Sequence, residues 1–473
     1  MLAHTLADSG RRVIVLEAGP IVRTADYQRE MGKNLGSWFW EGGMRVARGN
    51  VVMPTLQVRA LGGGSVFNSA ICMRPLDSAL ERWRDEHGLS DYTWDRLTPH
   101  FEAVEAFSNV KPVDPEVQGR RNELFREACE AMGWGAEPMP RAEKGCVGSG
   151  ECITGCRAGA KQSLDRRGIP EFVERGGEVF TSVEVEELVV DGNQVRGVVG
   201  WTVDPRTKQR VHPVRIQAEV TVLAAGPINT PVIARRSGLR REPVGANLRF
   251  HPSGYVLGVF DEKVDPWNGA TQGYHCLDFV EHGVKLESLW ATPSIFAMRM
   301  PRSARRFKRY LSRFDHMSVF DCWISGDDSV GKVRVLPGGK ADISYDLGMA
   351  DVRRLQEANA KLCDLFAAVG ATEVLTGIHG LPEVMPASQA AELIRAADLG
   401  PEDLPTASNH VMGSMSMGAD PTRAATDGWG AVYGVDNLYV CDTSLYPCSP
   451  GVNPQLTVMA LAHRLGQELP KRH

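Results

Sequence analysis

One histidine and one asparagine in the last quarter of the chain have neighbours that suit them to proton transfer. His410 stands in the segment N-H-V-M-G-S, and Asn453 directly precedes Pro454 in G-V-N-P-Q-L-T. A neutral imidazole can accept the proton of a hydroxyl group while a hydride leaves the same carbon. Proline is favoured in the first turn of a helix, so the positive end of that helix would point at whatever Asn453 contacts. The pair could therefore deprotonate an alcohol and stabilise a developing negative charge.

Three predicted buried strands end in residues that suit a bound dinucleotide. The first is 13–16, the second 220–226 and the third 437–442. Ligands of an α/β sheet bind beyond the carboxyl ends of its strands. The first strand ends in an acid that can accept the hydroxyl groups of an adenosine ribose. The residues expected at this edge are Glu17, Ala18, Gly19, Ala225, Gly226 and Asp442.

A glycine run near the amino end offers a second place for the dinucleotide. Gly62, Gly63 and Gly64 would let backbone N–H groups approach a pyrophosphate or a flat ring, with Ser65 closing the run. Asn68 adds a side-chain amide within reach of a flavin edge. A glycine run alone is more often a turn, so this prediction depends on the strand ends above.

These segments together resemble the glucose-methanol-choline (GMC) oxidoreductase family over nearly the whole chain. The resemblance implies a Rossmann-like FAD-binding domain with an inserted antiparallel-sheet substrate domain, and FAD-dependent oxidation of a CH–OH group by a dehydrogenase or oxidase. It implies His410 as the catalytic base, Asn453 as the group that orients the substrate oxygen, Pro454 beside the flavin and Val183 at the adenine. The branch with a His/Asn pair includes cholesterol oxidases and long-chain-alcohol oxidases. The motifs are V-I-V-L-E-A-G (13–19), G-G-G-S-V-F-N (62–68), A-A-G-P-I-N-T-P (224–231), S-G-L (237–239), V-G-A-N-L-R-F-H-P (244–252) and H-x-x-G-S, N-L-Y-V-x-D-x-S and G-V-N-P-x-x-T between 410 and 457.

The expected domain organisation follows the same motifs. We expect residues 1–80, 146–250 and 406–473 to form a discontinuous FAD-binding domain, and residues 81–145 to form a linking or cap segment. Residues 251–405 have more aromatic residues, prolines and short alternating strands, and we expect them to form the substrate-binding domain. Its aromatic residues favour a hydrophobic or ring-containing alcohol: Trp267, Tyr274, Trp290, Phe296 and Trp323.

Composition excludes several classes of protein. The 473 residues carry a formal net charge of −5, which provides no basic field for nucleic acid. No apolar run reaches the length of a membrane span, and residues 1–4 lack the features of a signal peptide, so we expect a cytoplasmic protein. The electron acceptor, whether oxygen, a quinone or a protein, is left open.

Two segments depart from the family pattern. The G-x-G-x-x-G phosphate loop is missing, and we expect it upstream of Met1, with a misassigned start favoured over a real truncation. Cys146, Cys152 and Cys156 occupy a segment in which Ser149 stands where many relatives have a fourth cysteine. They could hold an iron–sulfur cluster or, with a fourth ligand, zinc, but we favour a reduced, buried loop and no metal.

The sequence also contains a basic stretch, and it is compatible with two alternative functions. Residues 299–314 form an amphipathic stretch, which we expect to be a surface helix over the substrate domain rather than a membrane anchor. The first alternative function is a flavin-containing lyase on the same fold, in which His410 moves only protons. The second is a degenerate, FAD-free pseudoenzyme, suggested by the missing phosphate loop.

Overall fold

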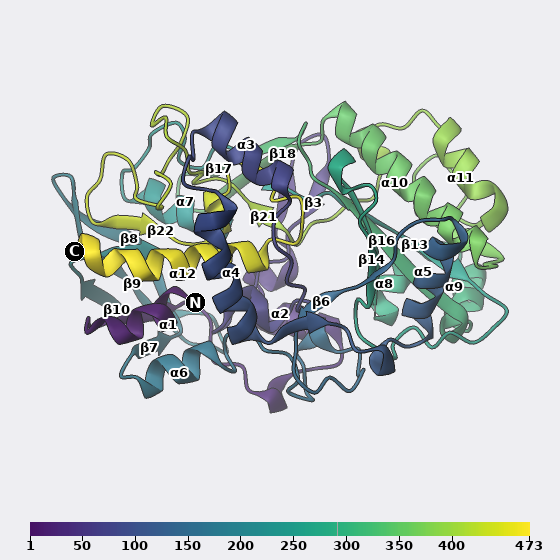
Figure 1. The fold of residues 1–473 in the computed structure, drawn as a ribbon, viewed down its shortest axis with the longest axis horizontal. Helices are drawn as coiled ribbons and strands as arrows, with labels where there is room; N and C mark the ends of the chain where they lie inside the picture. The colour runs from purple at the N-terminus through teal and green to yellow at the C-terminus, as the bar shows by residue number, and fades with distance from the viewer. Residues whose placement is uncertain (291) are drawn as a thin grey trace.

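The computed structural model describes residues 1–290 and 292–473 of the chain. Its two halves lie side by side (Figure 1). One half surrounds the long carboxyl-terminal helix α12 (Gln455–Arg472), and the other contains the largest sheet, which is covered by α10 (Met349–Ala368) and α11 (Ala387–Ala396). The predicted elements that lead to Asn453 and Asp442 therefore belong to the first half.

Short parallel strand pairs form the centre of the first half. β1 (Ile14–Glu17) pairs with β7 (Glu178–Thr181), and β11 (Thr221–Leu223) pairs with β22 (Leu438–Val440), both in parallel. The helix α1 (Leu2–Leu6) packs against α12. Parallel strands covered by helices match the predicted α/β class, and the three predicted strands that end at Glu17, at Ala225 and at Asp442 are confirmed as strands.

An antiparallel three-stranded sheet lies beside these pairs. It contains β8 (Val183–Asp191), β9 (Gln194–Val203) and β10 (Arg210–Gln217) in the order β10-β9-β8. The alternating residues 195–203 and 211–218 predict a hairpin, which β9 and β10 form. The alternating stretch 179–185 predicted one continuous strand, but the structure breaks it at Ser182, whose φ of 57° turns the chain between β7 and β8.

The second half is built on a seven-stranded sheet with the order β20-β19-β13-β16-β15-β14-β5. Side chains alternate between its two faces. Phe320, Cys322 and Leu286 pack in the hydrophobic core with α10, whereas Asp321, Trp323 and Glu287 point to the other face. The strands are β5 (Glu137–Pro138), β13 (Ser253–Val259), β14 (Tyr274–Cys276), β15 (Val284–Ser288), β16 (Met317–Ile324), β19 (Glu373–Leu375) and β20 (Met385–Pro386).

Several elements connect the two halves. The hairpin β17 (Val330–Val335) and β18 (Ala341–Asp346) joins β2 and β3 in a four-stranded sheet and also contacts α7 (Gly226–Arg236). The remaining elements are α2 (Met31–Trp38), β2 (Val46–Arg48), β3 (Val52–Pro54), α3 (Asp77–His87), α4 (Trp94–Ser108), β4 (Val110–Pro112), α5 (Arg120–Ala131), β6 (Pro140–Ala142), α6 (Gly168–Glu174), β12 (Arg249–Phe250), α8 (Pro293–Ala297), α9 (Ala304–Leu311) and β21 (Val411–Met412).

The predicted amphipathic stretch contains α9, which covers the sheet face opposite α10. Tyr310 and Phe314 are buried in an apolar cluster with Leu257 and Val319 of the sheet. Helical spacing predicts Leu311 on the same face as Tyr310 and Phe314, but Leu311 is 42% exposed, because the helix ends there and the chain turns before Phe314. Among the described residues, no helix combines the length and apolar character needed to cross a membrane.

Candidate active site

His410 and Asn453 lie next to each other, as their chemistry requires. His410 directly precedes β21, which pairs antiparallel with β12, and this pairing places His251 beside it. Asn453 stands at the start of α12, two residues before Gln455. The amide nitrogen of Asn453 is 3.4 Å from Nε2 of His410. Two segments far apart in the sequence thus converge on one point.

His251 continues this polar arrangement on the far side of His410. The Nδ1 atoms of the two rings are 3.1 Å apart, and the rings meet at an interplanar angle of 90°. His251 Nε2 lies 2.7 Å from Ser449 Oγ. The ring of His251 also stacks on Trp323, with centroids 4.3 Å apart. His251 therefore holds the imidazole of His410 in one orientation.

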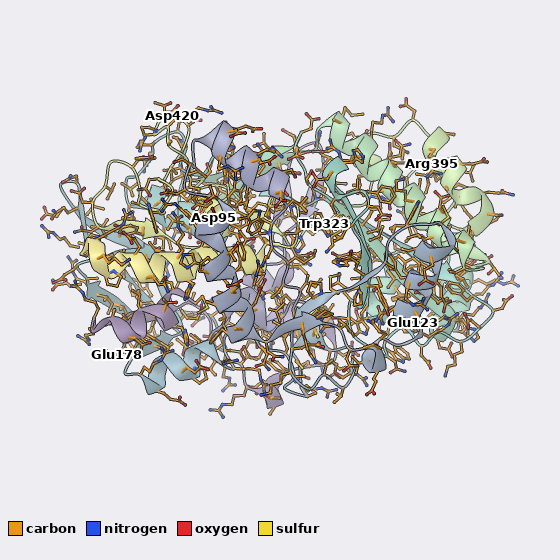
Figure 2. All side chains as sticks on the ribbon, in the orientation of Figure 1. Asp95, Glu123, Glu178, Trp323, Arg395 and Asp420 are labelled. Atoms are coloured by element: carbon orange, nitrogen blue, oxygen red, sulfur yellow. The ribbon has the colours of Figure 1, made fainter. Side chains whose placement is uncertain are left out.

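Charged residues of β15 and β16 form the wall opposite Asn453. Lys285 Nζ lies 2.8 Å from Asn453 Oδ1 and 2.5 Å from Glu287 Oε1, and it is completely buried. Trp323 Nε1 donates to the same Glu287 oxygen at 3.1 Å. Asp321, the cross-strand neighbour of Glu287, has a buried carboxyl oxygen with no hydrogen-bond partner among the described residues. Figure 2 shows Trp323 near the middle of the molecule, between the two halves.

Burial controls the protonation of this site. It lowers the pKa of His410 to about 4, an effect that Glu287 opposes and Lys285 increases. Burial also lowers the pKa of His251 well below its usual range, and His410 and Lys285 contribute in the same direction. The pKa of Asp321 is raised well above its usual range, first by burial and then by Glu287. Both histidines are consequently neutral at physiological pH, and His410 can accept a proton.

The predicted adenosine-binding residues form one group at the end of β1. Glu17 Oε1 accepts the backbone N–H of Gly19 at 2.7 Å, and burial raises the Glu17 pKa to about 7. Ala18 lies between these two residues. The backbone N–H of Ser182 donates to Gly19 O at 2.9 Å, so Val183 lies at the same edge. A Cβ atom at Gly19 would lie 2.2 Å from the Arg59 backbone, so only glycine fits there.

The glycine run lies next to this group, because the backbone N–H of Leu61 donates to Pro20 O. Gly63 and Gly64 begin a short 3-10 turn, and a Cβ atom at either would meet nothing within 4 Å. Gly62, with φ 97°, packs closely against Val66 and Asp165 instead. The Ser65 hydroxyl bonds to other protein groups: it donates to Gly62 O and accepts the Leu164 N–H. The open space is therefore beside Gly63 and Gly64.

A second group of predicted residues joins the ends of β11 and β22. Asp442 Oδ2 accepts the backbone N–H of Gly226 at 2.9 Å and the hydroxyl of Thr230 at 2.6 Å. The same hydroxyl accepts the backbone N–H of Ala225. The sequence predicts a helix over residues 230–237, but α7 starts at Gly226, because Asp442 holds this earlier turn in place. The carboxylate of Asp442 thus positions backbone that faces the strand ends.

Asn68 and Pro454 connect the glycine run to the catalytic pair. The Asn68 side chain donates to Gln455 Oε1 in the first turn of α12 and accepts the N–H of Ala70 at 3.0 Å. Pro454 O accepts the hydroxyl of Tyr446 at 2.8 Å. These contacts place residues 62–68 beside the amino end of α12. The predicted residues therefore form a path from Glu17 to His410.

The residues along this path fit FAD. A buried carboxylate at Glu17 suits a ribose, because its neutral or ionised form can bond to hydroxyl groups. The space beside Gly63 and Gly64 admits a group that side chains would exclude. The amino end of α12, which follows Asn453, would stabilise a negatively charged flavin. The donor set and the open backbone thus match the three parts of the dinucleotide.

The cysteine segment 146–156 surrounds a small, partly enclosed cavity. Cys146, Cys152 and Cys156 line one small cavity with Arg141 and Lys161. Arg141 Nη2 donates to Cys152 Sγ at 2.8 Å, and Lys161 Nζ donates to three backbone carbonyls, including that of Asn68. Within the part of the chain that the structure describes, no group of three ligating side chains has the geometry of a metal site.

Sequence reasoning missed His251, Lys285 and Glu287. His251 stands in the stretch V-G-A-N-L-R-F-H-P, so a signal was present, but only the pairing of β12 with β21 brings it to His410. Lys285 and Glu287 alternate along a strand whose other residues are apolar or small, and such inward charges in a buried strand are the signal that could have found them. Of the predicted aromatic residues, Trp323 lies at the site, whereas Tyr274 packs in the core on the opposite face of the sheet.

Comparisons with known proteins agree with this arrangement. The two family models described as GMC oxidoreductase match residues 36–253 and 327–462. An uncharacterised GMC-type oxidoreductase of Mycobacterium tuberculosis is 33% identical over 98% of this chain and 72% of its own length. A long-chain-alcohol oxidase of Arabidopsis thaliana is 26% identical over 99% of this chain and 64% of its own length.

Solved structures share the fold at lower sequence identity. Pyridoxine 4-oxidase from Mesorbium loti superposes with a TM-score of 0.74 at 18% identity, covering 100% of this chain and 97% of the other. Formate oxidase from Aspergillus oryzae RIB40, in an R554K variant, gives a TM-score of 0.72 at 15% identity, with 100% and 96% covered. The Rossmann-like domain with an inserted antiparallel sheet is therefore confirmed as the fold.

Proposed function

The chain belongs to the GMC oxidoreductase family, and from this membership we propose that it oxidises the CH–OH group of an alcohol with His410 as the base. The enzyme is a flavin-dependent oxidoreductase, and its cofactor is FAD. The observation that carries the proposal is the convergence of His410 and Asn453, 3.4 Å apart, at the amino end of α12.

Four sets of residues would hold FAD. Glu17, Ala18, Gly19 and Val183 lie at the edge suited to the adenosine, and Gly62–Ser65 at the open backbone suited to the pyrophosphate or the flavin. Ala225, Gly226 and Asp442 close the strand ends between them. Asn68, Asn453 and Pro454 would face the flavin. When bound, FAD supplies the acceptor for the hydride that leaves the alcohol carbon.

The chain's own residues orient and deprotonate the alcohol. Nε2 of His410 accepts the hydroxyl proton, because burial keeps the imidazole neutral above about pH 4. The amide of Asn453 donates to the alcohol oxygen, which gains negative charge as its proton leaves. His251 fixes the ring of His410 through the Nδ1 contact, and Trp323 covers His251 and excludes water.

The wall formed by β15 and β16 carries the charges of Lys285 and Glu287, but Trp323 and the apolar cluster beyond it support a hydrophobic alcohol as substrate. Trp323 lies 5.9 Å from the His410 ring, centroid to centroid, and the same sheet face continues into the apolar cluster around Leu257 and Val319. The likeness to a long-chain-alcohol oxidase points to the same substrate class. We propose that residues 251–405 supply this wall, and that residues 1–80, 146–250 and 406–473 hold the cofactor.

Anaerobic reduction of the bound flavin tests the proposal. The FAD-loaded enzyme is mixed with 1-dodecanol, benzyl alcohol, cholesterol or pyridoxine, and the loss of the visible flavin band is followed. Reduction by at least one of these alcohols, fastest for a hydrophobic one, is the expected result. A flavin that no alcohol reduces would favour a lyase, in which His410 only moves protons, and a colourless protein would contradict FAD binding.

A further inference from the structure

A line of hydrogen bonds runs through the active site from Lys285 to Ser449. Lys285 Nζ lies 2.8 Å from an atom of the Asn453 amide. An ammonium group has three N–H donors and no acceptor, so the amide atom that faces it is the oxygen, Oδ1. The amide nitrogen of Asn453 therefore faces Nε2 of His410, 3.4 Å away. Lys285 therefore determines which atom donates and which accepts in each hydrogen bond of this line.

The direction continues through both histidines. An amide nitrogen only donates, so neutral His410 offers a lone pair at Nε2 and carries its proton on Nδ1. That Nδ1–H donates to Nδ1 of His251 at 3.1 Å, which leaves the His251 proton on Nε2. His251 Nε2–H then donates to Ser449 Oγ at 2.7 Å, an oxygen that also accepts the N–H of Gly451 at 3.0 Å. Each hydrogen bond in this line therefore has one donor N–H and one acceptor.

We propose that Lys285 is a positioning residue that orients the Asn453 amide and thereby holds His410 in the tautomer with an unprotonated Nε2. This inference rests on the proposed function, in which Nε2 accepts the alcohol proton. With the amide reversed, Asn453 Oδ1 would accept a proton from Nε2 of His410, and the site would lose both its base and the N–H that faces the alcohol oxygen.

The surroundings of Lys285 support a fixed cation. Its ammonium group is 0% exposed and forms an ion pair with Glu287 at 2.5 Å. A buried charge needs such a partner, and removing one member of a buried pair leaves the other uncompensated. The other groups at its Nζ are the sulfur atoms of Met73 (3.1 Å) and Met139 (3.9 Å), so the Asn453 amide is its second strong acceptor. The titratable groups that face Lys285 are Glu287, Asp321, His251, His275 and His410.

The tautomer of His410 can be read without any substrate. Selective ¹⁵N labelling of histidine and NMR of the FAD-loaded enzyme distinguish Nδ1–H from Nε2–H, with His410→Gln assigning the signal. Lys285→Met combined with Glu287→Gln removes both charges, so no unpaired charge stays buried. We expect Nδ1–H in the wild type and a substantial Nε2–H population in the double variant. An unchanged Nδ1–H signal in the double variant would overturn the proposal.

Flavin reduction gives a second test through a double-mutant cycle. Anaerobic reduction by 1-dodecanol should be about 10- to 100-fold slower in the double variant, the effect of losing one charge-assisted hydrogen bond. In an Asn453→Ala background the same two substitutions should change the rate by less than about 2-fold, because Lys285 acts through Asn453. Losses that multiply in that background would overturn the proposal. A wild-type flavin that 1-dodecanol and the other alcohols leave oxidised would defeat the proposed function alone, because the NMR result still decides the role of Lys285.

Discussion

The imidazole rings of His251 and His410 meet edge to face, with their Nδ1 atoms 3.1 Å apart. Two ring nitrogens at this distance share one proton, so a second proton on either Nδ1 would place two N–H groups against each other. The contact therefore disfavours, in addition to burial, the doubly protonated form of His251, whose second proton would lie on Nδ1. It also fixes the plane of the His410 ring, so that Nε2 points towards Asn453.

Removal of the His410 imidazole should abolish the chemistry and leave the cofactor in place. We expect His410→Ala to bind FAD normally but to reduce it with alcohol about 10²- to 10⁴-fold more slowly, the usual contribution of a general base. Rapid-mixing anaerobic absorbance measures this rate. His212→Ala, at an exposed position of β10, is the matched control and should behave as the wild type. A wild-type rate in His410→Ala would show that another group takes the proton.

The rate of flavin reduction should fall only at low pH. Because burial lowers the His410 pKa to about 4, the imidazole is already neutral at pH 5, and the rate of reduction at low alcohol concentration should rise through about pH 4 and then stay level. The same shift destabilises the fold in acid: the unfolded chain binds a proton near pH 6.5 and the folded chain only near pH 4, so stability falls as pH decreases across this window. Short pH jumps of enzyme kept at neutral pH separate the two effects. An acid limb near pH 6.5 would contradict a buried, neutral base.

A carboxylate in place of the Asn453 amide should slow reduction. Asn453→Asp removes the N–H that faces His410 Nε2 and the alcohol oxygen, and it adds negative charge where negative charge develops. We expect about 100-fold slower flavin reduction, the usual effect of losing one such donor, with the fold intact because Lys285 can pair with the new carboxylate. Asn409→Asp adds the same charge at an exposed position beside His410 and serves as the control. Equal rates in the two variants would remove Asn453 from the mechanism.

The residues that sequence identified share one property: their motifs are contiguous. His410 and Asn453 each stand in a short pattern with a local meaning, a glycine turn after the histidine and a proline at a helix start. The strand that ends at Glu17 was equally visible from its run of apolar residues. Such local patterns specify an element and the residue at its end, and the sheet then brings the ends together.

The residues that sequence did not identify depend on partners distant in the chain. Lys285 reaches Asn453 only because β15 packs against the start of α12, and no local pattern encodes that contact. The early start of α7 at Gly226 depends on the carboxylate of Asp442, 216 residues further along. The break between β7 and β8 requires a positive φ at Ser182, and a serine in the sequence does not predict this conformation.

Two glycine substitutions should distinguish a position that faces the cofactor, Gly64, from a position that packs against the protein backbone, Gly19. Gly64 is exposed, and a Cβ atom there would meet no protein atom within 4 Å, so Gly64→Ala should leave the thermal unfolding of the apoprotein unchanged or raise it slightly. If FAD occupies that open space, the same methyl group should weaken FAD binding at least about 10-fold, or about 1.4 kcal/mol. Titration of FAD into apoprotein, followed by flavin fluorescence, measures the affinity.

Gly19→Ala should behave in the opposite way. Its Cβ atom would lie 2.2 Å from the backbone of Arg59, so the fold itself should lose about 1–3 kcal/mol or more, as for other forced overpacking. Gly32→Ala, in α2 with open space around it, controls for the added methyl group and should leave the FAD affinity unchanged and the fold no less stable. Wild-type FAD affinity in Gly64→Ala would mean that the cofactor does not approach this turn, and residues 62–65 would then be structural, while Glu17 and the start of α12 would still be available to bind it.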